Sequence, residues 1–313
     1  MLDDKVKTIK GMNMDNEIFH VGATVSDIDY HQRFLTQTLS MKVMSDSGRE
    51  GEWIDNVTGL TGFKARNVYI TPDGINRIEM FQIFRPQLSS VPLTYGTYLG
   101  IAHLGINAEN FATIADSLQL QSLDLNDIRY DERRGSLFFQ DNSGLNWKIS
   151  QADDPGAGDA AVDNSVNLSH VRVVVSDVQR TLKIYSEFLG LVFLDIKSEA
   201  VQLQDMDGRW LTTDAVIYRL RTGRQQILEL CQYKDYKPLP NPRRKINCLG
   251  LHHLAFKVPD AVTLFTRLQE VGCSAVSDPQ HIPMGPNRGG VLFYFYDPDG
   301  TILEILQPPA KSS

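Results

Sequence analysis

Residues 290–307 read Gly-Val-Leu-Phe-Tyr-Phe-Tyr-Asp-Pro-Asp-Gly-Thr-Ile-Leu-Glu-Ile-Leu-Gln, which predicts a strand, a tight turn and a second strand. The run from Val291 to Tyr296 is apolar and aromatic, as a half-buried strand should be. In Asp297-Pro298-Asp299-Gly300, proline fixes φ and glycine supplies a positive φ. The second strand is apolar except for Glu304, and a carboxylate there is costly unless it is paired or binds a metal. Glu304 is therefore a candidate ligand.

The landmarks of the second half of the chain also occur in the first half, in the same order and at nearly constant spacing. Three pairs of strand motifs and one pair of turns match: His20-Val-Gly-Ala-Thr-Val-Ser-Asp27 with His170-Val-Arg-Val-Val-Val-Ser-Asp177, Arg77-Ile-Glu-Met-Phe81 with Ile227-Leu-Glu-Leu-Cys231, His103-Leu-Gly-Ile106 with His253-Leu-Ala-Phe256, and Asp141-Asn-Ser-Gly144 with Asp297-Pro-Asp-Gly300. This order indicates an internal duplication.

Each half divides again into two units of strand, helix and three strands. Helices are predicted over 27–39, 109–120, 177–189 and 259–271, with Asp177 placed to cap the third and Gly190 to end it. The units span roughly 18–86, 99–150, 168–237 and 250–308. Residues 151–167 are rich in Ala, Gly, Asp and Asn and read as a linker. We therefore predict an α+β fold with an N-terminal domain, residues 1–150, and a C-terminal domain, residues 168–313.

Composition narrows the class of protein. The chain has 313 residues and a formal net charge of -7, and its pI is about 5.5, which argues against a nucleic-acid surface. Neither a secretory signal nor an apolar stretch long enough for a membrane span is evident in the sequence. The three cysteines show no CxxC spacing, so neither a disulfide framework nor a thiolate zinc site is indicated. We expect a cytoplasmic protein.

Glu304 has three potential partners at matching positions of the second half: His170, Glu229 and His253. Two histidines and two carboxylates suit one divalent metal ion such as Fe, Mn, Ni, Co or Zn. An octahedral ion with four protein ligands has two adjacent coordination positions open, which a small substrate with vicinal oxygens could fill. His252 competes with His253 for the ligand role, but the repeat aligns His103 with His253.

These motifs resemble those of the vicinal oxygen chelate superfamily, which includes glyoxalase I, methylmalonyl-CoA epimerase, extradiol dioxygenases and fosfomycin-resistance enzymes. The resemblance rests on the stretches that begin at His170, Ile227, His253 and Asp297, and it covers nearly the whole chain. It implies four βαβββ modules paired into two glyoxalase-like domains, whose cup-shaped mixed sheets hold the metal at the base. The reaction stays open, because one fold hosts many chemistries.

The first half departs from this pattern. His20, Glu79 and His103 are present, but Lys148 aligns with Glu304. A protonated lysine cannot bind a metal, and its charge repels the ion. We therefore expect a degenerate site in the first half, with a three-ligand site as the alternative, and one working site in the chain.

The way in which the units pair decides the ligand set. Pairing within each half gives His170, Glu229, His253 and Glu304, and is favoured because sequential elements usually lie together. Exchanged pairing, with the first unit beside the fourth, gives His20, Glu79, His253 and Glu304 instead. His253 and Glu304 belong to the complete site in both arrangements.

Three functions are considered. The first is a lyase or isomerase of the glyoxalase or epimerase kind, in which the metal acidifies a C–H bond and Glu229 or Glu304 acts as general base. Arg172, two residues after His170, should face the same side and could bind a carboxylate or enolate, unless it pairs with a neighbouring glutamate.

The second is an Fe(II) extradiol dioxygenase, for which the resemblance implies His170, His253 and Glu304 as the facial triad and Tyr294 as an active-site residue. Against it, that family has a catalytic histidine a few residues before the tyrosine, whereas the nearest histidine here, His281, lies too far before Tyr294. Glu229 is also unusual for that family.

The third is a non-catalytic binding or resistance protein. The expected partner is a small molecule, with neither nucleic acid nor membrane, and the chain could also form a homodimer.

Overall fold

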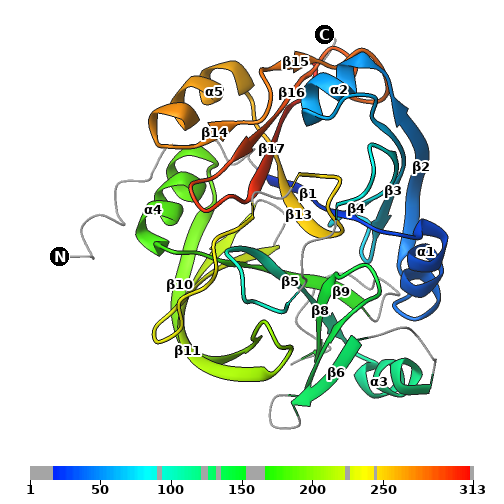
Figure 1. Ribbon diagram of the computed structural model, residues 1–313, viewed down its shortest axis with the longest axis vertical. Helices are drawn as coiled ribbons and strands as arrows, with labels where there is room; N and C mark the ends of the chain where they lie inside the picture. The colour runs from blue at the N-terminus through cyan, green and yellow to red at the C-terminus, as the bar shows by residue number, and fades with distance from the viewer. Residues whose placement is uncertain are drawn as a thin grey trace.

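The computed structural model describes residues 17–89, 94–120, 126–131, 135–152, 166–222, 226–242 and 245–310. These residues form two large mixed sheets with helices beside them (Figure 1). The order strand, helix and three strands recurs in four modules with small additions, as predicted, so the fold is α+β. Most of the predicted linker, residues 153–165, lies outside the described residues.

The first sheet joins the first and fourth modules. In order across the sheet, its strands are β14 (Ser274–Ala275), β16 (Val291–Tyr296), β17 (Ile302–Gln307), β13 (Gly250–Lys257), β1 (Glu17–Thr24), β4 (Ile78–Arg85), β3 (Lys64–Thr71) and β2 (Lys42–Glu50), and β15 (Gln280–His281) pairs with β16. At its centre β1 runs antiparallel to β13, and each of these runs parallel to the last strand of its own module, β4 or β17.

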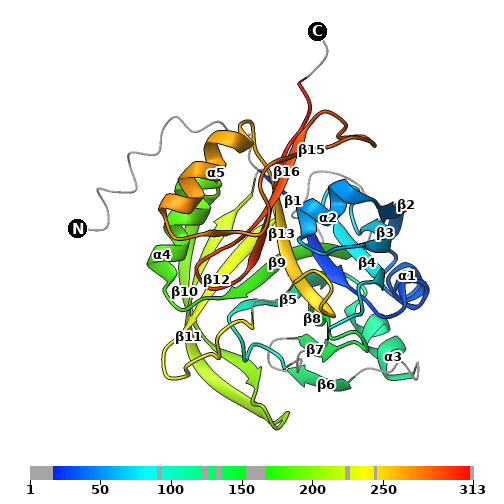
Figure 2. The ribbon, with the colours of Figure 1, turned by 45° about the horizontal axis from the view of Figure 1, so that its top comes forward.

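The second sheet joins the second and third modules. In order across the sheet, its strands are β10 (Val192–Gln204), β11 (Trp210–Arg221), β12 (Ile227–Tyr233), β9 (Val166–Val174), β5 (Gly100–Ala108), β8 (Asn146–Gln151), β7 (Ser136–Gln140) and β6 (Asn126–Asp131). β9 and β5 meet antiparallel at the centre, as β1 and β13 do in the first sheet. Figure 2 shows the long pair β10 and β11 curling at one end of this sheet.

The four predicted helices are present, and three of them begin after an aspartate cap. They are α1 (Ile28–Gln37), α3 (Phe111–Leu120), α4 (Val178–Lys183), which continues as the π-helix η2 (Ile184–Phe188), and α5 (Ala261–Glu270). The carboxylates of Asp27, Asp177 and Asp260 accept backbone N–H groups at the helix starts, which would otherwise lack partners. Gly190 follows η2 with a φ of 73°. α2 (Glu52–Thr58), between β2 and β3, is an addition that the sequence did not predict.

Each sheet uses its two faces differently because side chains alternate along a strand. One face of both sheets contributes to a shared central core with the helices, as Val21, Leu104, Val171 and Leu254 do. The other face of the first sheet carries Phe81, Ile83 and Leu292 and is covered by Ile54 and Val57 of α2. We call this face the first cup.

The second cup is the corresponding face of the second sheet and carries Ala102, Leu203, Ile217 and Cys231. It lacks a counterpart of α2, since residues 205–209 between β10 and β11 form a tight turn in which the Asp205 N–H bonds the Arg209 carbonyl at 2.9 Å. A cavity of about 640 Å³ lies in this cup.

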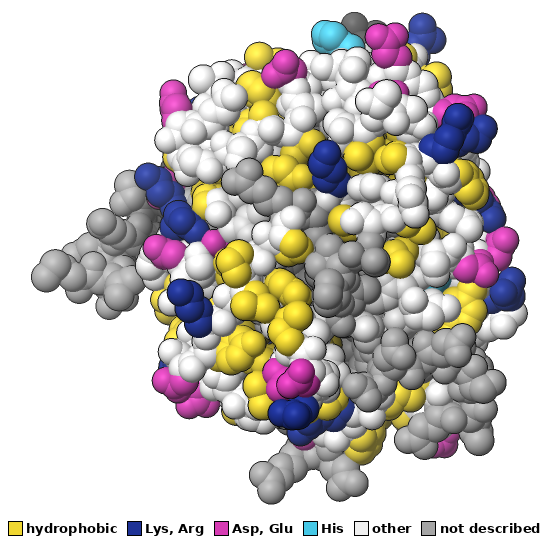
Figure 3. All heavy atoms as spheres, viewed as in Figure 1, with side chains coloured by type: hydrophobic (Ala, Val, Ile, Leu, Met, Phe, Trp, Pro, Cys, Tyr) yellow, Lys and Arg dark blue, Asp and Glu magenta, His cyan; other side chains and the backbone are white. Residues whose placement is uncertain are grey.

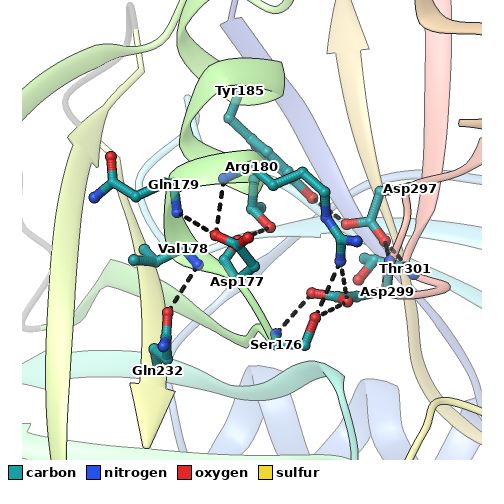
Figure 4. Close-up of polar contacts among 11 residues, drawn as sticks. Ser176, Asp177, Val178, Gln179, Arg180, Tyr185, Gln232, Asp297, Asp299 and Thr301 are labelled. Carbon is teal, nitrogen blue, oxygen red and sulfur yellow. Dashed lines mark hydrogen bonds and ion pairs between the residues drawn. The ribbon is translucent and has the colours of Figure 1, made fainter. Parts of the chain in front are cut away.

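Contacts between modules of the same half connect the two sheets (Figure 4). The backbone N–H of Ser176, just before α4, donates to Asp299 Oδ2 at 2.8 Å, and Arg180 Nη2 donates to Asp299 Oδ1 at 2.7 Å. The Tyr185 hydroxyl donates to Asp297 Oδ2 at 3.2 Å. The predicted turn after β16 therefore also joins the fourth module to the third.

The pairing within each half that the sequence favours is wrong, and the exchanged pairing is observed. β1 lies beside β13 and β5 beside β9, so each sheet takes one module from each half. Residues 1–150 and 168–313 therefore describe the repeat in the sequence and do not correspond to the two sheets.

The register of the central strands supplies a physical reason for this exchange. Gly22 lies opposite His253, and a Cβ atom on Gly22 would fall 1.9 Å from the imidazole ring. Gly105 lies opposite His170 in the same way, with its Cβ 2.1 Å from that ring. Pairing β9 with β13 in this register would instead place Arg172 opposite His253 and Ala255 opposite His170, so neither imidazole ring would lie opposite a glycine.

The described surface mixes both signs of charge. On the face in Figure 3, Lys and Arg side chains lie among Asp and Glu side chains. Of the helices in the described ranges, none has the length and apolarity needed to cross a membrane.

Candidate metal centre

Four polar side chains meet in the first cup, one from each of four adjacent strands. They are His20 on β1, Glu79 on β4, His253 on β13 and Glu304 on β17, and one ligand atom of each lies within 4.8 Å of all the others. The two Nε2 atoms are 2.9 Å apart, and Glu79 Oε2 lies 3.0 Å from His20 Nε2 and 3.3 Å from His253 Nε2. Glu304 Oε2 lies 3.5 Å and 3.3 Å from the same nitrogens.

This spacing matches the donor atoms around a small cation. With metal–ligand bonds of about 2.1 Å, neighbouring donors at right angles are about 3 Å apart. All four residues are buried, with exposed fractions of 1% for His20, 4% for Glu79, 0% for His253 and 6% for Glu304. Two buried carboxylates side by side are unfavourable without a compensating positive charge. The donor set therefore fits a divalent metal ion.

The pKa shifts of the ligand side chains also favour a positive charge at this centre. Burial lowers the pKa of His20, but the Glu79 and Glu304 carboxylates outweigh it and raise this pKa to about 10. Burial opposes ionisation of Glu79, yet His20 and His253 hold the pKa of this carboxyl well below its usual value. A positive charge at this centre is thus strongly favoured, whether a proton or a metal ion supplies it.

A chain of hydrogen bonds orients His253. The Thr24 hydroxyl must donate to the Ile246 carbonyl, which can only accept, so Thr24 Oγ1 accepts from His252 Nε2 at 3.1 Å. His252 Nδ1 then accepts from His253 Nδ1, which lies 2.9 Å away. In this tautomer the Nε2 lone pair of His253 faces the other three ligands, the orientation that suits metal binding.

The two carboxylates are held from opposite sides. Asn67 Nδ2 donates to Glu79 Oε1 at 3.0 Å, so Oε2 is the oxygen directed at the histidines. The Tyr294 hydroxyl donates to Glu304 Oε2 at 2.9 Å. The Tyr69 ring packs edge-on against His20 with ring centroids 5.3 Å apart. Tyr294, a predicted site residue, therefore contacts a ligand directly.

The second cup holds the residues that correspond to these ligands in the repeat, but their pKa shifts and the fourth residue differ. His103 Nε2 and His170 Nε2 are 3.0 Å apart, and Glu229 Oε2 lies 3.7 Å from His170 Nε2. Burial and nearby cations lower the pKa of His170 to about 4 and the pKa of His103 well below its usual value. Lys148 stands at the fourth position, where the first cup has Glu304.

The predicted ligand set His170, Glu229, His253 and Glu304 is not brought together. His253 and Glu304 lie on the first sheet, whereas His170 and Glu229 lie on the second, because the modules are exchanged. The predicted facial triad of the dioxygenase hypothesis is divided in the same way. His20 and Glu79, which the sequence offered as the alternative, replace the two missing ligands.

The sequence predicted Arg172 and Glu229 as catalytic residues at the metal centre. In the structure both lie away from it. Arg172 Nη2 donates to Glu229 Oε2 at 2.6 Å and to Glu199 Oε1 at 3.0 Å. The Arg172 and His170 charges outweigh burial and lower the pKa of Glu229 to about 2. The alternative reading of Arg172, a partner of neighbouring glutamates, is therefore the observed one.

Sequence reasoning missed the residues that support the ligands: Gly22, Thr24, Asn67, Tyr69 and the orienting role of His252. Gly22 carries the clearest signal, because the repeat places Arg172 at the matching position of the second half. Asn67 and Tyr69 lie on β3 with alternate spacing, but their strand contains no motif that marks them.

Comparison with known proteins identifies the family of the chain. Residues 167–305 match the model of the Glyoxalase/Bleomycin resistance protein/Dioxygenase superfamily. A 2-epi-5-epi-valiolone epimerase from Actinomyces sp is 30% identical over 162 residues, which are 48% of this chain and 83% of that protein. The chain belongs to this superfamily.

Solved structures show the same fold across nearly the whole chain. Glyoxalase I from Zea mays superposes with a TM-score of 0.63 at 16% identity, covering 93% of this chain and 92% of that chain. A putative dioxygenase from Bacillus subtilis superposes with a TM-score of 0.55 at 14% identity, covering 94% and 86%. At these identities the likeness concerns the superfamily fold alone.

Proposed function

We propose that the chain is a metal-dependent epimerase or related isomerase that acts on a small molecule with vicinal oxygens, and that the metal ligands are His20, Glu79, His253 and Glu304. The observation that carries the proposal is the convergence of these four donors in a buried cup. The epimerase relative supports an isomerase over the other chemistries of the superfamily.

A divalent ion held by this set would act as a Lewis acid toward two neighbouring substrate oxygens and acidify the adjacent C–H bond. The order of strands across the sheet is β17, β13, β1 and β4, so Glu304 and Glu79 flank the two histidines from opposite sides. A substrate carbon between the two carboxylates can lose its proton to one and regain a proton from the other. This arrangement suits inversion at that carbon.

The neighbouring residues tune these two carboxylates. Asn67 donates to Glu79 Oε1, so Oε2 is the oxygen of that carboxylate that can exchange a proton with the substrate. The Tyr294 hydroxyl donates to Glu304 Oε2, so it stays in contact with that oxygen when the carboxylate takes up a proton. Ile54, Val57 and Phe63 exclude water from the cup, which strengthens the electrostatic interactions inside it.

The test is metal analysis of the full chain purified without chelators, followed by incubation with 2-epi-5-epi-valiolone in D₂O. We expect about one Mn, Ni, Co or Zn ion for each chain and deuterium uptake at one substrate carbon. Glu79→Gln and Glu304→Gln should lose both the metal and the exchange. Glu229→Gln, at the matching position of the second cup, should keep both.

Other results would point to other functions. Iron together with oxygen consumption on catechols would replace the isomerase by the dioxygenase. Metal-free protein, or a Glu304→Gln variant with unchanged metal content, would remove the metal centre from the proposal. Failure with this substrate but exchange with other hydroxy ketones would change the substrate and leave the reaction class in place.

A further inference from the structure

The second cup keeps an accessible cavity of about 640 Å³, a size typical of small-molecule sites. Its lining combines aromatic rings with cations, principally Tyr95, Phe138, Tyr233, Arg129, Lys148 and Arg172. In the first cup, Ile54 and Val57 of α2 cover the corresponding face of the sheet. The two cups therefore differ in access as well as in their polar residues.

The centre of the second cup is balanced in charge without a metal ion. Its two histidines are bonded to each other, and neutral forms of both are favoured, as the lowered pKa values of His103 and His170 indicate. Glu229 is matched by Arg172 at 2.6 Å. Lys148 adds a cation where the first cup has a carboxylate, so a divalent metal would meet repulsion in place of a fourth ligand.

The cations of the cavity lie beside aromatic rings. Lys148 lies on β8 and lines the cavity, with its Nζ 5.6 Å from the centroid of the Phe138 ring. Arg129 lies near the end of β6, with its guanidinium carbon 5.4 Å from the centroid of the Trp210 ring. Tyr95 stacks on His103 and presents a flat apolar wall beside them. Asp131 and Glu199 are the lining carboxylates, and Glu199 already binds Arg172 at 3.0 Å.

We propose that the second cup is a metal-independent binding site for a small organic anion with a flat apolar body. The anionic group binds the Lys148 ammonium, and the apolar body lies against the aromatic rings of the lining. The lining holds the cations Arg129, Lys148 and Arg172, of which Arg172 is paired with Glu229 and Glu199, and a carboxylate that reaches Lys148 replaces water in a half-buried site, where its attraction is strengthened. This site does not depend on the function proposed for the first cup.

The test uses isothermal titration calorimetry of the full chain, treated with a chelator, with benzoate as the probe. We expect saturable binding and at least tenfold weaker binding of benzyl alcohol, which lacks the charge. Acetate, which lacks the ring, should also bind more weakly. Equal binding of benzoate and benzyl alcohol would overturn the assignment of an anion.

Variants locate the site. Lys148→Met should weaken benzoate binding about tenfold or more, whereas Lys148→Arg should largely keep it. Arg129→Gln, which removes another cation of the lining, should weaken it less and serves if Lys148→Met does not fold. Glu304→Gln, which removes a ligand of the first cup, should leave benzoate binding unchanged. Absence of saturable binding, indifference to Lys148→Met, or loss in Glu304→Gln would each overturn the proposal.

Discussion

Gly22 is the residue on which the position of His253 depends. Its missing side chain leaves room for an imidazole ring that would otherwise meet a Cβ atom at 1.9 Å. We predict that Gly22→Ala displaces His253 and weakens metal binding about 10- to 100-fold, a loss of the size seen when support of a ligand is removed. Competition with a fluorescent chelator measures this affinity.

Gly105→Ala is the matched control for this substitution. It creates the same collision at 2.1 Å, but with His170 in the second cup. Metal affinity should therefore stay at the level of the unchanged protein, while the stability of the second sheet falls. Equal loss of metal in both variants would mean that the glycines act through general stability and not through His253.

Glu229 makes the stability of the protein sensitive to acid. Burial opposes its ionisation, but the Arg172 and His170 charges lower its pKa from 4.5 to about 2 in the folded state. A carboxyl with a depressed pKa contributes stability above its unfolded pKa and loses this contribution as the pH falls toward the folded value.

We therefore predict that the free energy of unfolding from this group decreases between pH 4.5 and about 2. Urea unfolding at stepped pH measures the slope. In Glu229→Gln the slope in this window should be smaller, and the variant should be less stable at pH 7, because Arg172 loses its main partner. A slope identical in both proteins would be incompatible with this pair as its source.

At the scale of elements, the turn before β17 links the two sheets through Asp299. Its carboxylate is buried and accepts from the Ser176 backbone, the Ser176 hydroxyl and Arg180. We predict that Asp299→Ala lowers the free energy of unfolding by about 2–3 kcal/mol, since it leaves a backbone donor and a guanidinium without this acceptor. Chemical denaturation measures the change.

Asp207→Ala offers the comparison for this prediction. Asp207 faces Arg209 at 3.7 Å with both side chains largely exposed, so its loss should hardly change stability. If the two variants were equally stable, the contacts in Figure 4 would not hold the modules together.

The helices differ in how well sequence patterns predicted them. α1, α4 and α5 begin after an aspartate whose carboxylate accepts the first N–H groups, and this signal is visible in the chain. α2 follows Gly51 without a side-chain cap and has only 7 residues. Tertiary contacts of Ile54 and Val57 with the first cup stabilise it, so its local sequence carried little information.

At the scale of the whole molecule, the exchange of modules makes the metal centre a joint product of both halves. His20 and Glu79 come from the first half, and His253 and Glu304 from the second. We predict that the fragments 1–152 and 166–313 each fail to bind metal, whereas their mixture forms a one-to-one complex with about one metal ion. Size-exclusion chromatography with metal analysis of each peak measures this.

The fragment 166–313 is the informative one, because it contains the ligand set expected from pairing within the half. In the observed register Arg172 would face His253 there, in the place that Gly22 takes in the intact chain. Metal binding by this fragment alone, at the affinity of the intact chain, would contradict the requirement for exchange.

Much of the protein was readable from its sequence because the information is local and repeated. The duplicated motifs predicted four βαβββ modules, the alternation of apolar residues predicted strands, and Glu304 in an apolar strand predicted a buried partner. His253, Glu304 and Tyr294 were correctly placed together for the same reason, since all three belong to one module.

The choice of partners for that module was not local. Both ways of pairing satisfy the pattern of each strand, and they differ only in which side chains meet across the central antiparallel pair of each sheet. Gly22 opposite His253 and Gly105 opposite His170 give one glycine to each cup, whereas pairing within halves would give both glycines to one cup. The close approach of imidazole rings to a neighbouring backbone, visible only in three dimensions, thus selects His20 and Glu79 as the remaining ligands.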